Sequence, residues 1–569
     1  MSLDKSIRIT SPDKGKGLVI MRTQDYHSKL ETILSDCSKF SLCHETEEKL
    51  VQRLELKLNT FLRKIKSNNA LSETQYKQLY ASGSSVGAMY GLAKTHKSNI
   101  PLRPIVSTYK THNYNLGKFV APLISHLANN EHTIQNSYQF SNEISKLDNS
   151  AGHHMCSFDI ESLYTNIPVS ETIDIILNKL FPHPNKAYNG FKRLEFEKLL
   201  HLALDDSYFR FNGKIFKQKD GLSMGAPLSP IIANIFLCDF ERRAFQQCDT
   251  WLIPRIYRRF LDDTFILFDN HDQSKTFFDF FNGFHQNINF TYENEINGKL
   301  SFLDINIVKD ANSFITSIFR KPTFSGKGTN YFSFIYYRYK ISGIKALLYR
   351  AYELSSTSDL FHKEVQFLKN YFFNNNFPAR IFEKTVQKFL SDKLDFRVKV
   401  DTAPKLEIYF QLPFLGKVSE NMIHELRKLI INHYPHVKPS FYFRSVRKIR
   451  SFFPLKDKTP IMMDSGVVYN YKCDCTQSYI GSTATNFYIR VCQHRGISFR
   501  TKEQLKTPTI SSIREHCLKK CKISIKNENF SIMDRCPEDD NLRLLESIYI
   551  KKMNPTLNEC RTAVPLLIC

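Results

Sequence analysis

The spacing of apolar residues changes several times along the chain. In the stretch from residue 24 to residue 80, apolar residues recur at helical spacing among charged ones, as in EEKLVQRLELKLNTFLRKIK, which predicts helices. From Tyr90 to Ser107, short apolar runs and two prolines exclude a helix and predict strands and turns. Residues 340–400, with ISGIKALLYRAYEL and KEVQFLKNYF, return to helical spacing. The chain therefore alternates predicted helices with predicted sheet-forming stretches.

Three further segments combine an apolar pattern with polar residues at a turn. HHMCSFDI, at residues 153–160, is a short apolar run that ends in an acid, and it predicts a buried strand. IPRIYRRFLDDTFILF predicts a β-hairpin with Asp262 and Asp263 at its turn. KQKDGLSMGAPLSPIIANIFL predicts a glycine-containing turn that leads into an apolar helix.

The length of 569 residues is too great for one ordinary hydrophobic core and predicts two to four domains. Between residues 401 and 464 lie an apolar run, a basic cluster (Arg444, Arg447, Lys448 and Arg450) and the polar connector PLKDKTP. We place the last domain boundary in this connector, because domain boundaries fall in polar segments. The remaining segment is predicted to be a compact, basic and cysteine-rich unit.

Composition narrows the class of partner. Hydrophobic residues make up 42% of the chain and charged residues 24%, which is a globular balance. Lys and Arg total 79 against 56 Asp and Glu, a net charge of +23, and aromatic residues make up 13%. Basic residues among aromatic ones favour nucleic acid over a membrane surface, because phosphates need cations and bases stack on rings.

The sequence predicts no membrane span and an intracellular protein. The longest uncharged stretch, Gly221–Cys238, is broken by Pro227 and Pro230, and MSLDKSIRIT has no apolar signal-peptide core. Inside a cell, the 13 cysteines are expected to be reduced thiols or metal ligands. Eight of the 13 lie at or beyond Cys473, which indicates a separate, metal-assisted C-terminal module.

The three segments that contain Asp159, the glycine-rich turn and the adjacent acids form a candidate polymerase site. Two neighbouring carboxylates ionise together at low cost only when a cation lies between them. With Asp159 arriving from another strand end, Asp262 and Asp263 would form an oxygen site suited to Mg²⁺. Two such ions about 4 Å apart would activate a primer 3′ hydroxyl and stabilise the leaving pyrophosphate. Taken singly, each segment is also compatible with an ordinary surface turn.

The combination resembles the A, B and C motifs of reverse transcriptases, and in particular those of Penelope-like retroelements, which are relatives of telomerase. The matching segments are LYTNIP after the first acid, MGAPLSP, FLDDTF, DKGKGLVIM, GLAKTHK with PLRPIVS, FTYENEINGKLSFLDI and FRKPT. They cover the chain from about Asp13 to beyond Asn374. The resemblance implies an α+β multidomain fold, with a right-hand polymerase of fingers, a palm with an antiparallel sheet, and a helical thumb.

The resemblance also implies roles for residues at matching positions. Asp159 and Asp262 would be the principal Mg²⁺ ligands, with Asp263 in support. Tyr164 would exclude the 2′ hydroxyl of ribonucleotides; a packed aromatic is the alternative. Lys299 would donate a proton to pyrophosphate, and a salt-bridged lysine is the alternative. The residues that would bind template, incoming nucleotide or triphosphate are Lys94, Lys97, Arg103, Gln218, Gly221 and Met224, of which the three cations could equally be solvated surface residues.

GVVYNYKCDCTQSYIGSTATNFYIRVCQHR resembles the signature of GIY-YIG nucleases. The first element departs from the name, since Val467 and Val468 precede Tyr469, whereas Tyr479, Ile480 and Gly481 are intact. Such a nuclease needs a proton acceptor, a cation for the phosphorane charge and an acid that binds a divalent ion. The residues that would supply these functions are Tyr469 near the general base, Arg490 as electrophile, Glu546 as ligand of one Mg²⁺, Tyr479 and His494 in support, and Asn558 as the terminal asparagine of the signature.

Cysteines inside and after this signature suggest a second metal site. Penelope-like enzymes with this nuclease often have two cysteines inserted here and two histidines downstream. By this resemblance Cys473, Cys475, His516 and Cys521 would bind a structural Zn²⁺, with cysteine in place of the last histidine. Buried reduced thiols are the alternative, and Cys517 is a spare in either case.

The resemblance divides the chain into five parts. They are residues 1–150 as N-terminal helices and fingers, 151–335 as palm, 336–400 as helical thumb, 401–464 as a basic connector, and 465–569 as a small α/β GIY-YIG endonuclease domain.

The implied function is that of a retrotransposon polymerase that nicks DNA and extends the exposed 3′ end by copying its own RNA. Its partners would be element RNA, target DNA and dNTPs, and it would act in the nucleus, where chromosomal DNA lies. Two alternatives are a nucleic-acid-binding protein with decayed sites and a maturase-like protein in which only the nuclease is active. The retained acids, Arg490 and Glu546 argue against decay.

Overall fold

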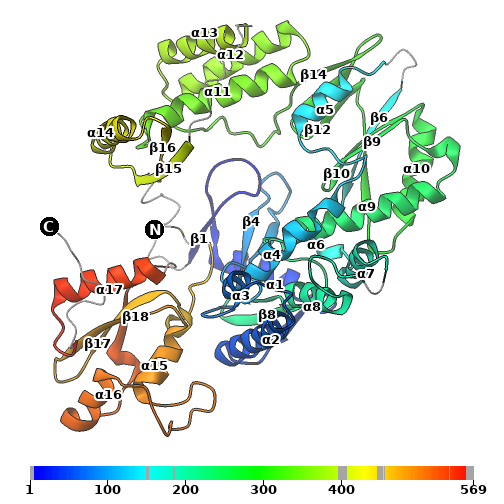
Figure 1. Cartoon of the computed structure of the whole chain (residues 1–569). Coiled ribbons are helices and arrows are strands. Elements are labelled where there is room, and N and C mark those ends of the chain that lie inside the picture. Colours follow the sequence, from blue (N-terminus) through cyan, green and yellow to red (C-terminus); the bar gives the residue numbers. More distant parts are fainter. Residues whose placement is uncertain are drawn as a thin grey trace.

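The N-terminal part of the chain forms a five-stranded sheet of order β3-β8-β7-β4-β5, flanked by helices (Figure 1). The computed structural model describes residues 6–148, 153–183, 186–394, 406–444, 453, 455–536 and 539–558. The N-terminal elements are β1 (Ile7–Thr10), β2 (Val19–Arg22), α1 (Thr23–Leu34), β3 (Phe40–Cys43), α2 (Glu47–Ser67), α3 (Glu73–Leu79), β4 (Gly87–Ala93), β5 (Leu102–Ser107), α4 (Tyr114–Ile124), η1 (Ser125–Ala128) and α5 (Ser137–Ile144). The strands β7 (Tyr208–Phe211) and β8 (Lys214–Gln218) come from the segment predicted as palm and complete this sheet.

The segment predicted as palm contains a four-stranded antiparallel sheet of order β11-β6-β10-β9, which we call the palm sheet. Its elements are β6 (His154–Ile160), α6 (Leu163–Asn166), α7 (Val169–Leu180), α8 (Arg193–Leu204), α9 (Ser229–Gln247), η2 (Thr250–Leu252), β9 (Ile256–Phe260), β10 (Asp263–Phe268), α10 (His271–Gly283) and β11 (Phe290–Asn294). The predicted buried strand and the predicted hairpin are both confirmed. Phe158 of β6 packs in the core formed with α9 and α10, while Met155 packs in a second core on the other face. Burial on both faces explains why β6 is a nearly continuous apolar run.

A second sheet and three helices follow the palm. The three-stranded sheet contains β12 (Lys299–Phe302), β13 (Ile305–Lys309) and β14 (Phe314–Ile318), and the helices are α11 (Tyr337–Leu354), α12 (Ser358–Asn374) and α13 (Ala379–Leu394). Helical spacing in 340–400 predicted these helices, which enclose buried Ile344, Leu368 and Phe382. Arg350 pairs with Asp304 at 2.8 Å and ties α11 to the sheet.

Residues 401–464, predicted as a connector, contain a folded β–α–β unit. It consists of β15 (Leu406–Pro413), α14 (Lys417–His433) and β16 (Val437–Arg444), with the two strands parallel. The apolar run seen in the sequence is strand β15, and a helix connects it to its parallel partner, as parallel pairing requires. Of the basic cluster, Arg444 ends β16, and Arg447, Lys448 and Arg450 lie outside the described residues.

The C-terminal unit has a three-stranded antiparallel sheet of order β18-β17-β19. Its elements are η4 (Ile461–Met463), β17 (Val467–Lys472), β18 (Ser478–Thr483), α15 (Phe487–Arg495), α16 (Ser512–His516), the π-helical turn η5 (Cys517–Cys521), η6 (Asn527–Asn529), β19 (Phe530–Arg535) and α17 (Asp539–Met553). Figure 1 shows this unit beside the N-terminal elements and apart from α11–α13.

The C-terminal unit is joined to the N-terminal part by buried contacts. Met463 packs with Leu50 and Val86 in one small core. The Asn486 side chain donates hydrogen bonds to the Ser84 carbonyl at 2.9 Å and to the Met463 carbonyl at 3.0 Å. Because these groups are buried, the two parts form a packed joint rather than two domains on a free linker.

One strand interrupts the predicted helical region between residues 24 and 80. Residues Phe40–Cys43 form β3, which pairs antiparallel with β8, Phe40 lying opposite Gln218. The partner strand lies far away in sequence, so local spacing could not show this pairing.

A buried ion pair supports the palm hairpin. The side chains of Arg259 on β9 and Glu241 on α9 are each 1% exposed and form a salt bridge. Arg259 also donates to Asn234 Oδ1 at 2.8 Å and to the Leu261 carbonyl at 3.3 Å. Since Leu261 precedes Asp262 in the turn, this arginine connects the palm core to the turn that holds the acids.

We expect Arg259→Ala to lower the free energy of unfolding by about 3–5 kcal/mol, because it leaves the Glu241 carboxylate buried and unpaired. Chemical denaturation followed by circular dichroism measures this change. Arg258→Ala is the matched control: its side chain is 26% exposed and pairs with Glu143, which is 29% exposed, so the cost should stay below about 1 kcal/mol. Equal costs for the two variants would contradict the role assigned to Arg259.

Candidate functional sites

Strand pairing brings the three predicted acids together. Asp263, the first residue of β10, lies directly opposite Asp159 of β6. Asp262 lies in the turn before β10, and its carbonyl accepts a hydrogen bond from the Ile160 amide at 3.2 Å. The turn requires a left-handed backbone at Leu261, with φ of 56°. The sequence predicted these acids as a group, and the structure places them on one end of the palm sheet.

The acids interact strongly with one another. Limited hydration and the charges of Asp263 and Asp262 raise the pKa of Asp159 to about 6. Limited hydration and Asp262 also raise the pKa of Asp263. Carboxylates that resist ionisation when they are close together are stabilised by a divalent cation, and their oxygens are ligands that Mg²⁺ prefers. The donor set therefore fits the predicted Mg²⁺ site.

Two lysines that the site prediction did not include lie near these acids. The charges of Lys14 and Lys321 lower the pKa of Asp159, opposing the effect of its acidic neighbours. Lys14 lies in the loop between β1 and β2, and Lys321 follows β14. Lys14 lies in DKGKGLVIM and Lys321 in FRKPT, two segments that resemble the retroelement enzymes. That resemblance was the sequence signal that could have identified both lysines. The predicted Lys299 is exposed at the start of β12.

The predicted cations of the fingers gather beside Lys14. Arg103 on β5 pairs with Asp13 Oδ1 at 3.2 Å, and the Asp13 side chain is 3% exposed. Burial lowers the pKa of Lys94, and the charges of Arg103 and Lys97 lower it further. Like charges held this closely favour an anion between them. The group therefore fits an anion, and its contact with a triphosphate remains a prediction. Asp13, which pairs with Arg103, was not among the predicted site residues.

Tyr164 lies next to the glycine-rich loop. The Tyr164 carbonyl accepts a hydrogen bond from the Leu222 amide at 2.6 Å. Burial and the charge of Asp262 raise the pKa of Tyr164, so the ring is half-buried within reach of the acids. A Cβ on Gly221 would meet the Thr165 carbonyl oxygen at 2.7 Å, with φ of 76°. Glycine is therefore required for the close approach of the loop to α6.

The other two predicted residues of this loop make internal contacts. Gln218 is buried, accepts a hydrogen bond from Ser223 Oγ at 2.9 Å and donates to the Asp220 carbonyl at 3.1 Å. The Met224 carbonyl accepts from the Val106 amide at 3.1 Å, which joins the loop to β5. These bonds set the shape of the loop, and template contact by either residue remains a prediction.

A second cluster of predicted residues lies in the C-terminal unit. Tyr469 on β17 hydrogen-bonds His494 Nε2 on α15 at 2.7 Å, and Arg490 Nε donates to the Tyr469 hydroxyl at 3.1 Å. Ser482 Oγ on β18 donates to Glu546 Oε2 on α17 at 2.7 Å. A Cβ on Gly481 would lie 2.7 Å from the Tyr469 hydroxyl oxygen, so this glycine makes room for the tyrosine.

Burial sets the protonation states in this cluster. It raises the pKa of fully buried Tyr469 and of Tyr479, so both hydroxyls keep their protons at neutral pH. Burial and the Arg490 charge lower the pKa of His494 to about 3, so its ring is neutral. Burial raises the pKa of Glu546 while Ser482 and Arg490 oppose that rise. A neutral histidine, a cation and a carboxyl are thus held on adjacent elements.

Asn558 lies against β18. The Ile480 amide donates to Asn558 Oδ1 at 3.0 Å, and Asn558 Nδ2 donates to the Ile480 carbonyl at 2.8 Å. This two-point contact holds the segment after α17 against the strand that carries Tyr479. The structure thus gives Asn558 a positioning role beside the other predicted residues.

The predicted zinc ligands converge. The ligand atoms of Cys473, Cys475, His516 and Cys521 all lie within 4.8 Å of one another. His516 Nε2 is 3.2 Å from Cys475 Sγ and 3.1 Å from Cys521 Sγ. Tetrahedral Zn²⁺ with Zn–S bonds of about 2.3 Å separates its sulfur ligands by about 3.8 Å, so the group fits this ion. The Cys517 thiol is not part of this group and instead contacts Tyr471, with its Sγ 3.0 Å from the Tyr471 hydroxyl.

Comparison with family models matches residues 95–295 to the reverse transcriptase (RNA-dependent DNA polymerase) family. This range contains Asp159, Asp262 and Asp263. Residues 329–387 match the animal helix-turn-helix domain, a range that spans α11 and α12. The chain therefore contains a reverse transcriptase domain, which supports RNA-directed DNA polymerase activity.

Several solved structures are similar to this chain at low sequence identity. One is a telomerase from Candida albicans in complex with a TWJ fragment of telomeric RNA, with 10% identity and a TM-score of 0.46 over 75% of this chain and 71% of that one. Another is apo telomerase from Candida tropicalis, with 11% identity and a TM-score of 0.40 over 69% and 74%. A third is the Sicinivirus 3Dpol RNA-dependent RNA polymerase, with 12% identity and a TM-score of 0.36 over 56% and 70%. A comparison with curated proteins finds no match.

Among the described residues, no helix combines the length and the apolar character needed to cross a membrane.

The raised pKa of Asp159 predicts a pH dependence of Mg²⁺ binding. Since Mg²⁺ binds the ionised carboxylate, a proton competes with it below about pH 6. We expect the Mg²⁺ concentration for half-maximal primer extension to rise up to roughly tenfold per pH unit below pH 6 and to be nearly constant from pH 7 to 8. Asp279→Ala, which removes an exposed acid of α10, should give the same curve as the unmodified chain. A half-saturation that does not change down to pH 5 would contradict the prediction.

The cysteine–histidine group predicts one tightly bound Zn²⁺ per chain. Elemental analysis of the purified protein should find stoichiometric zinc, and Cys475→Ser or Cys521→Ser should remove most of it. Cys517→Ser is the matched control, because its thiol contacts Tyr471 and lies outside the group, so it should keep the metal. Zinc well below one equivalent in the unmodified chain, or an equal loss in all three variants, would reject the site.

Proposed function

We propose that this chain is the RNA-directed DNA polymerase of a Penelope-like retroelement, which nicks target DNA with its C-terminal unit and copies element RNA from the exposed 3′ end. The observation that carries the proposal is the convergence of Asp159, Asp262 and Asp263 on one sheet end within the range that matches the reverse transcriptase family. The expected ligands are the RNA template, the DNA primer, dNTPs and Mg²⁺.

In the polymerase step, the chain positions charges around the reacting phosphates. Two Mg²⁺ ions, when bound by the three carboxylates, supply charge neutralisation for the primer hydroxyl and the leaving pyrophosphate. The charges of Lys14 and Lys321 act on Asp159, and the Arg103 charge acts on Lys14, so these three cations would hold the triphosphate of the incoming nucleotide. Tyr164, whose pKa the Asp262 charge raises, would exclude a 2′ hydroxyl from the sugar position.

In the nicking step, the C-terminal unit provides the groups that phosphodiester hydrolysis needs. Glu546 would hold one Mg²⁺, which would supply charge neutralisation for the leaving group, and Arg490 would stabilise the negative charge of the pentacoordinate phosphate. Tyr469 is fully buried and hydrogen-bonded to both Arg490 and His494, so it positions these two side chains. Tyr479 is less buried than Tyr469, so we assign contact with the attacking water to Tyr479.

The alternative in which only the nuclease is active has less support. It requires the palm acids to be structural, but neighbouring carboxylates that raise one another's pKa values destabilise a fold unless a cation is bound. Nuclear residence follows from the need to reach chromosomal DNA.

Two variants separate the proposed activities. Asp262→Ala should abolish primer extension on an RNA template while plasmid nicking continues, because it removes only a palm ligand. Glu546→Ala should abolish nicking while extension of a pre-nicked plasmid continues. The assay contains purified chain, intact or nicked plasmid, RNA, Mg²⁺ and all four dNTPs.

The controls remove exposed acids at a distance from each site, Asp279→Ala on α10 and Glu528→Ala on η6, and both activities should persist. DNA synthesis by Asp262→Ala at the unmodified rate would overturn the polymerase assignment. Nicking by Glu546→Ala at the unmodified rate would overturn the nuclease assignment.

A further inference from the structure

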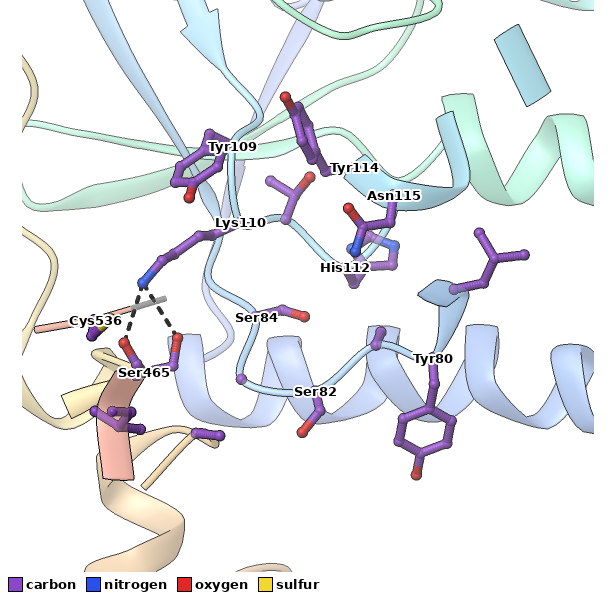
Figure 2. Close-up of a pocket in the computed structure, with 17 residues that line it drawn as sticks. Tyr80, Ser82, Ser84, Tyr109, Lys110, His112, Tyr114, Asn115, Ser465 and Cys536 are labelled. Carbon is purple, nitrogen blue, oxygen red and sulfur yellow. Dashed lines mark hydrogen bonds between the residues drawn. The ribbon is translucent and has the colours of Figure 1, made fainter. Parts of the chain in front are cut away.

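A pocket of about 260 Å³ lies at the joint between the N-terminal part and the C-terminal unit (Figure 2). On one side it is lined by the segment before β4, which includes Tyr80 and Ser84, and by the segment after β5, which includes Tyr109. On the other side it is lined by Ser465 and Ala484, which flank the strand pair β17 and β18. The pocket therefore exists only because the two parts pack together.

The pocket lies between the two candidate sites. Leu542, which lines it, is on α17 one helical turn before Glu546. At the other end, Thr111 and Tyr114 line both this pocket and a smaller neighbouring cavity. The smaller cavity is lined by Leu222–Ser223 and Ala226–Ser229 of the glycine-rich loop that follows Tyr164. A strand lying in the pocket would thus connect the surroundings of Glu546 with those of the palm.

Aromatic rings and cations at the pocket match the chemistry of a single nucleic-acid strand. Tyr80 is 46% exposed and Tyr109 is 57% exposed, and Tyr109 meets Tyr114 edge to face at 5.7 Å between ring centroids. Lys110 lines the pocket, and Lys118, which lies outside the lining, has its Nζ 5.8 Å from the Tyr114 ring. Figure 2 shows Tyr109 and Tyr114 at one end and Tyr80 at the other, with Ser84 and His112 between them. Exposed rings stack on unpaired bases, and neighbouring lysines contact the phosphates.

The lining also includes a polar group that lacks a partner. His112 is 6% exposed, and among the described residues its Nε2 finds no hydrogen-bond partner. Burial lowers its pKa to about 4, so at neutral pH the ring is uncharged. Buried polar atoms of this kind are normally satisfied by a ligand or water. A neutral imidazole suits the edge of a base better than a phosphate.

Lys110 closes the pocket at the domain joint. Its Nζ donates to the Ser465 carbonyl at 3.2 Å and to Ser465 Oγ at 3.5 Å, as Figure 2 shows. The volume is below the roughly 300–1,000 Å³ of pockets that enclose a whole drug-sized ligand. The space therefore suits one nucleoside unit of a longer strand.

We infer that this pocket binds unpaired nucleotides of a single strand that runs between the nuclease surroundings and the glycine-rich loop, with Tyr80 and Tyr109 stacking on bases. The choice of nucleic acid as ligand rests on the proposed function, whereas the pocket and its lining do not. Either an unpaired RNA template or the freed DNA strand has the required chemistry.

The test compares the affinity of the full chain for two labelled probes by fluorescence anisotropy, without nucleotides. One probe is a blunt RNA–DNA hybrid, and the other is the same hybrid with a single-stranded extension of the template strand. The chain should bind the extended probe more tightly. In Tyr80→Ala/Tyr109→Ala, the affinity ratio of extended to blunt probe should fall by roughly tenfold or more, since both rings that stack on bases are removed.

Matched variants identify the cause of that fall. Tyr80→Phe/Tyr109→Phe keeps the rings and should keep the ratio. Tyr434→Ala removes a tyrosine that is 57% exposed at the end of α14, and it should also keep the ratio. Extensions of RNA and of DNA in separate arms identify which strand occupies the pocket, and a ratio that falls in either arm supports the inference.

An unchanged ratio in the alanine variant in both arms would overturn the inference. This outcome differs from failure of the proposed function, because binding is measured without catalysis. Primer extension that is absent from the unmodified chain, with the extension-dependent binding intact, would count against the polymerase assignment alone.

Discussion

The antiparallel pairing of β6 with β10 is the constraint on which the polymerase site depends. This register sets Asp263 opposite Asp159 and leaves Asp262 in the adjoining turn. Limited hydration and the mutual repulsion of the three carboxylates both oppose ionisation in this arrangement, as the raised pKa of Asp159 indicates. The sheet withstands this repulsion because β6 is buried on both faces. The fold thus stores an electrostatic cost at the site that a bound cation would relieve.

The buried pair of Arg259 and Glu241 links that register to the palm core. Arg259 bonds to α9 and to the Leu261 carbonyl, so the same side chain contacts the core and the turn before Asp262. The Gly221 loop is also held by contacts with distant segments. Gly221 lies close to the Thr165 backbone, and the Met224 carbonyl accepts a hydrogen bond from the Val106 amide of β5. Local backbone positions at the site are therefore determined by bonds from different parts of the chain.

The packed joint between the C-terminal unit and the N-terminal part places the two candidate sites on one body. Met463 and Asn486 contribute buried contacts to this joint. The pocket described above also forms there. If both sites are active, the product of one would be released at high effective concentration beside the other. A flexible tether would raise that concentration less, because it would spread the product over a larger volume.

The sequence by itself determined several elements and the group of acids. The apolar run that ends at Asp159, the hairpin around Asp262 and the helices of 340–400 are visible as local patterns, because burial and turn geometry impose local spacing. The four predicted zinc ligands came instead from the resemblance to Penelope-like enzymes. Tertiary structure alone decided the rest. The pairing of β3 with β8, the approach of Lys14 and Lys321 to the acids, and the pocket at the domain joint each combine segments far apart in sequence. The segment predicted as a connector folds as β15-α14-β16, because β15 pairs in parallel with β16, and no local pattern reveals that pairing. Contacts between distant segments depend on three-dimensional packing, which residue spacing does not record.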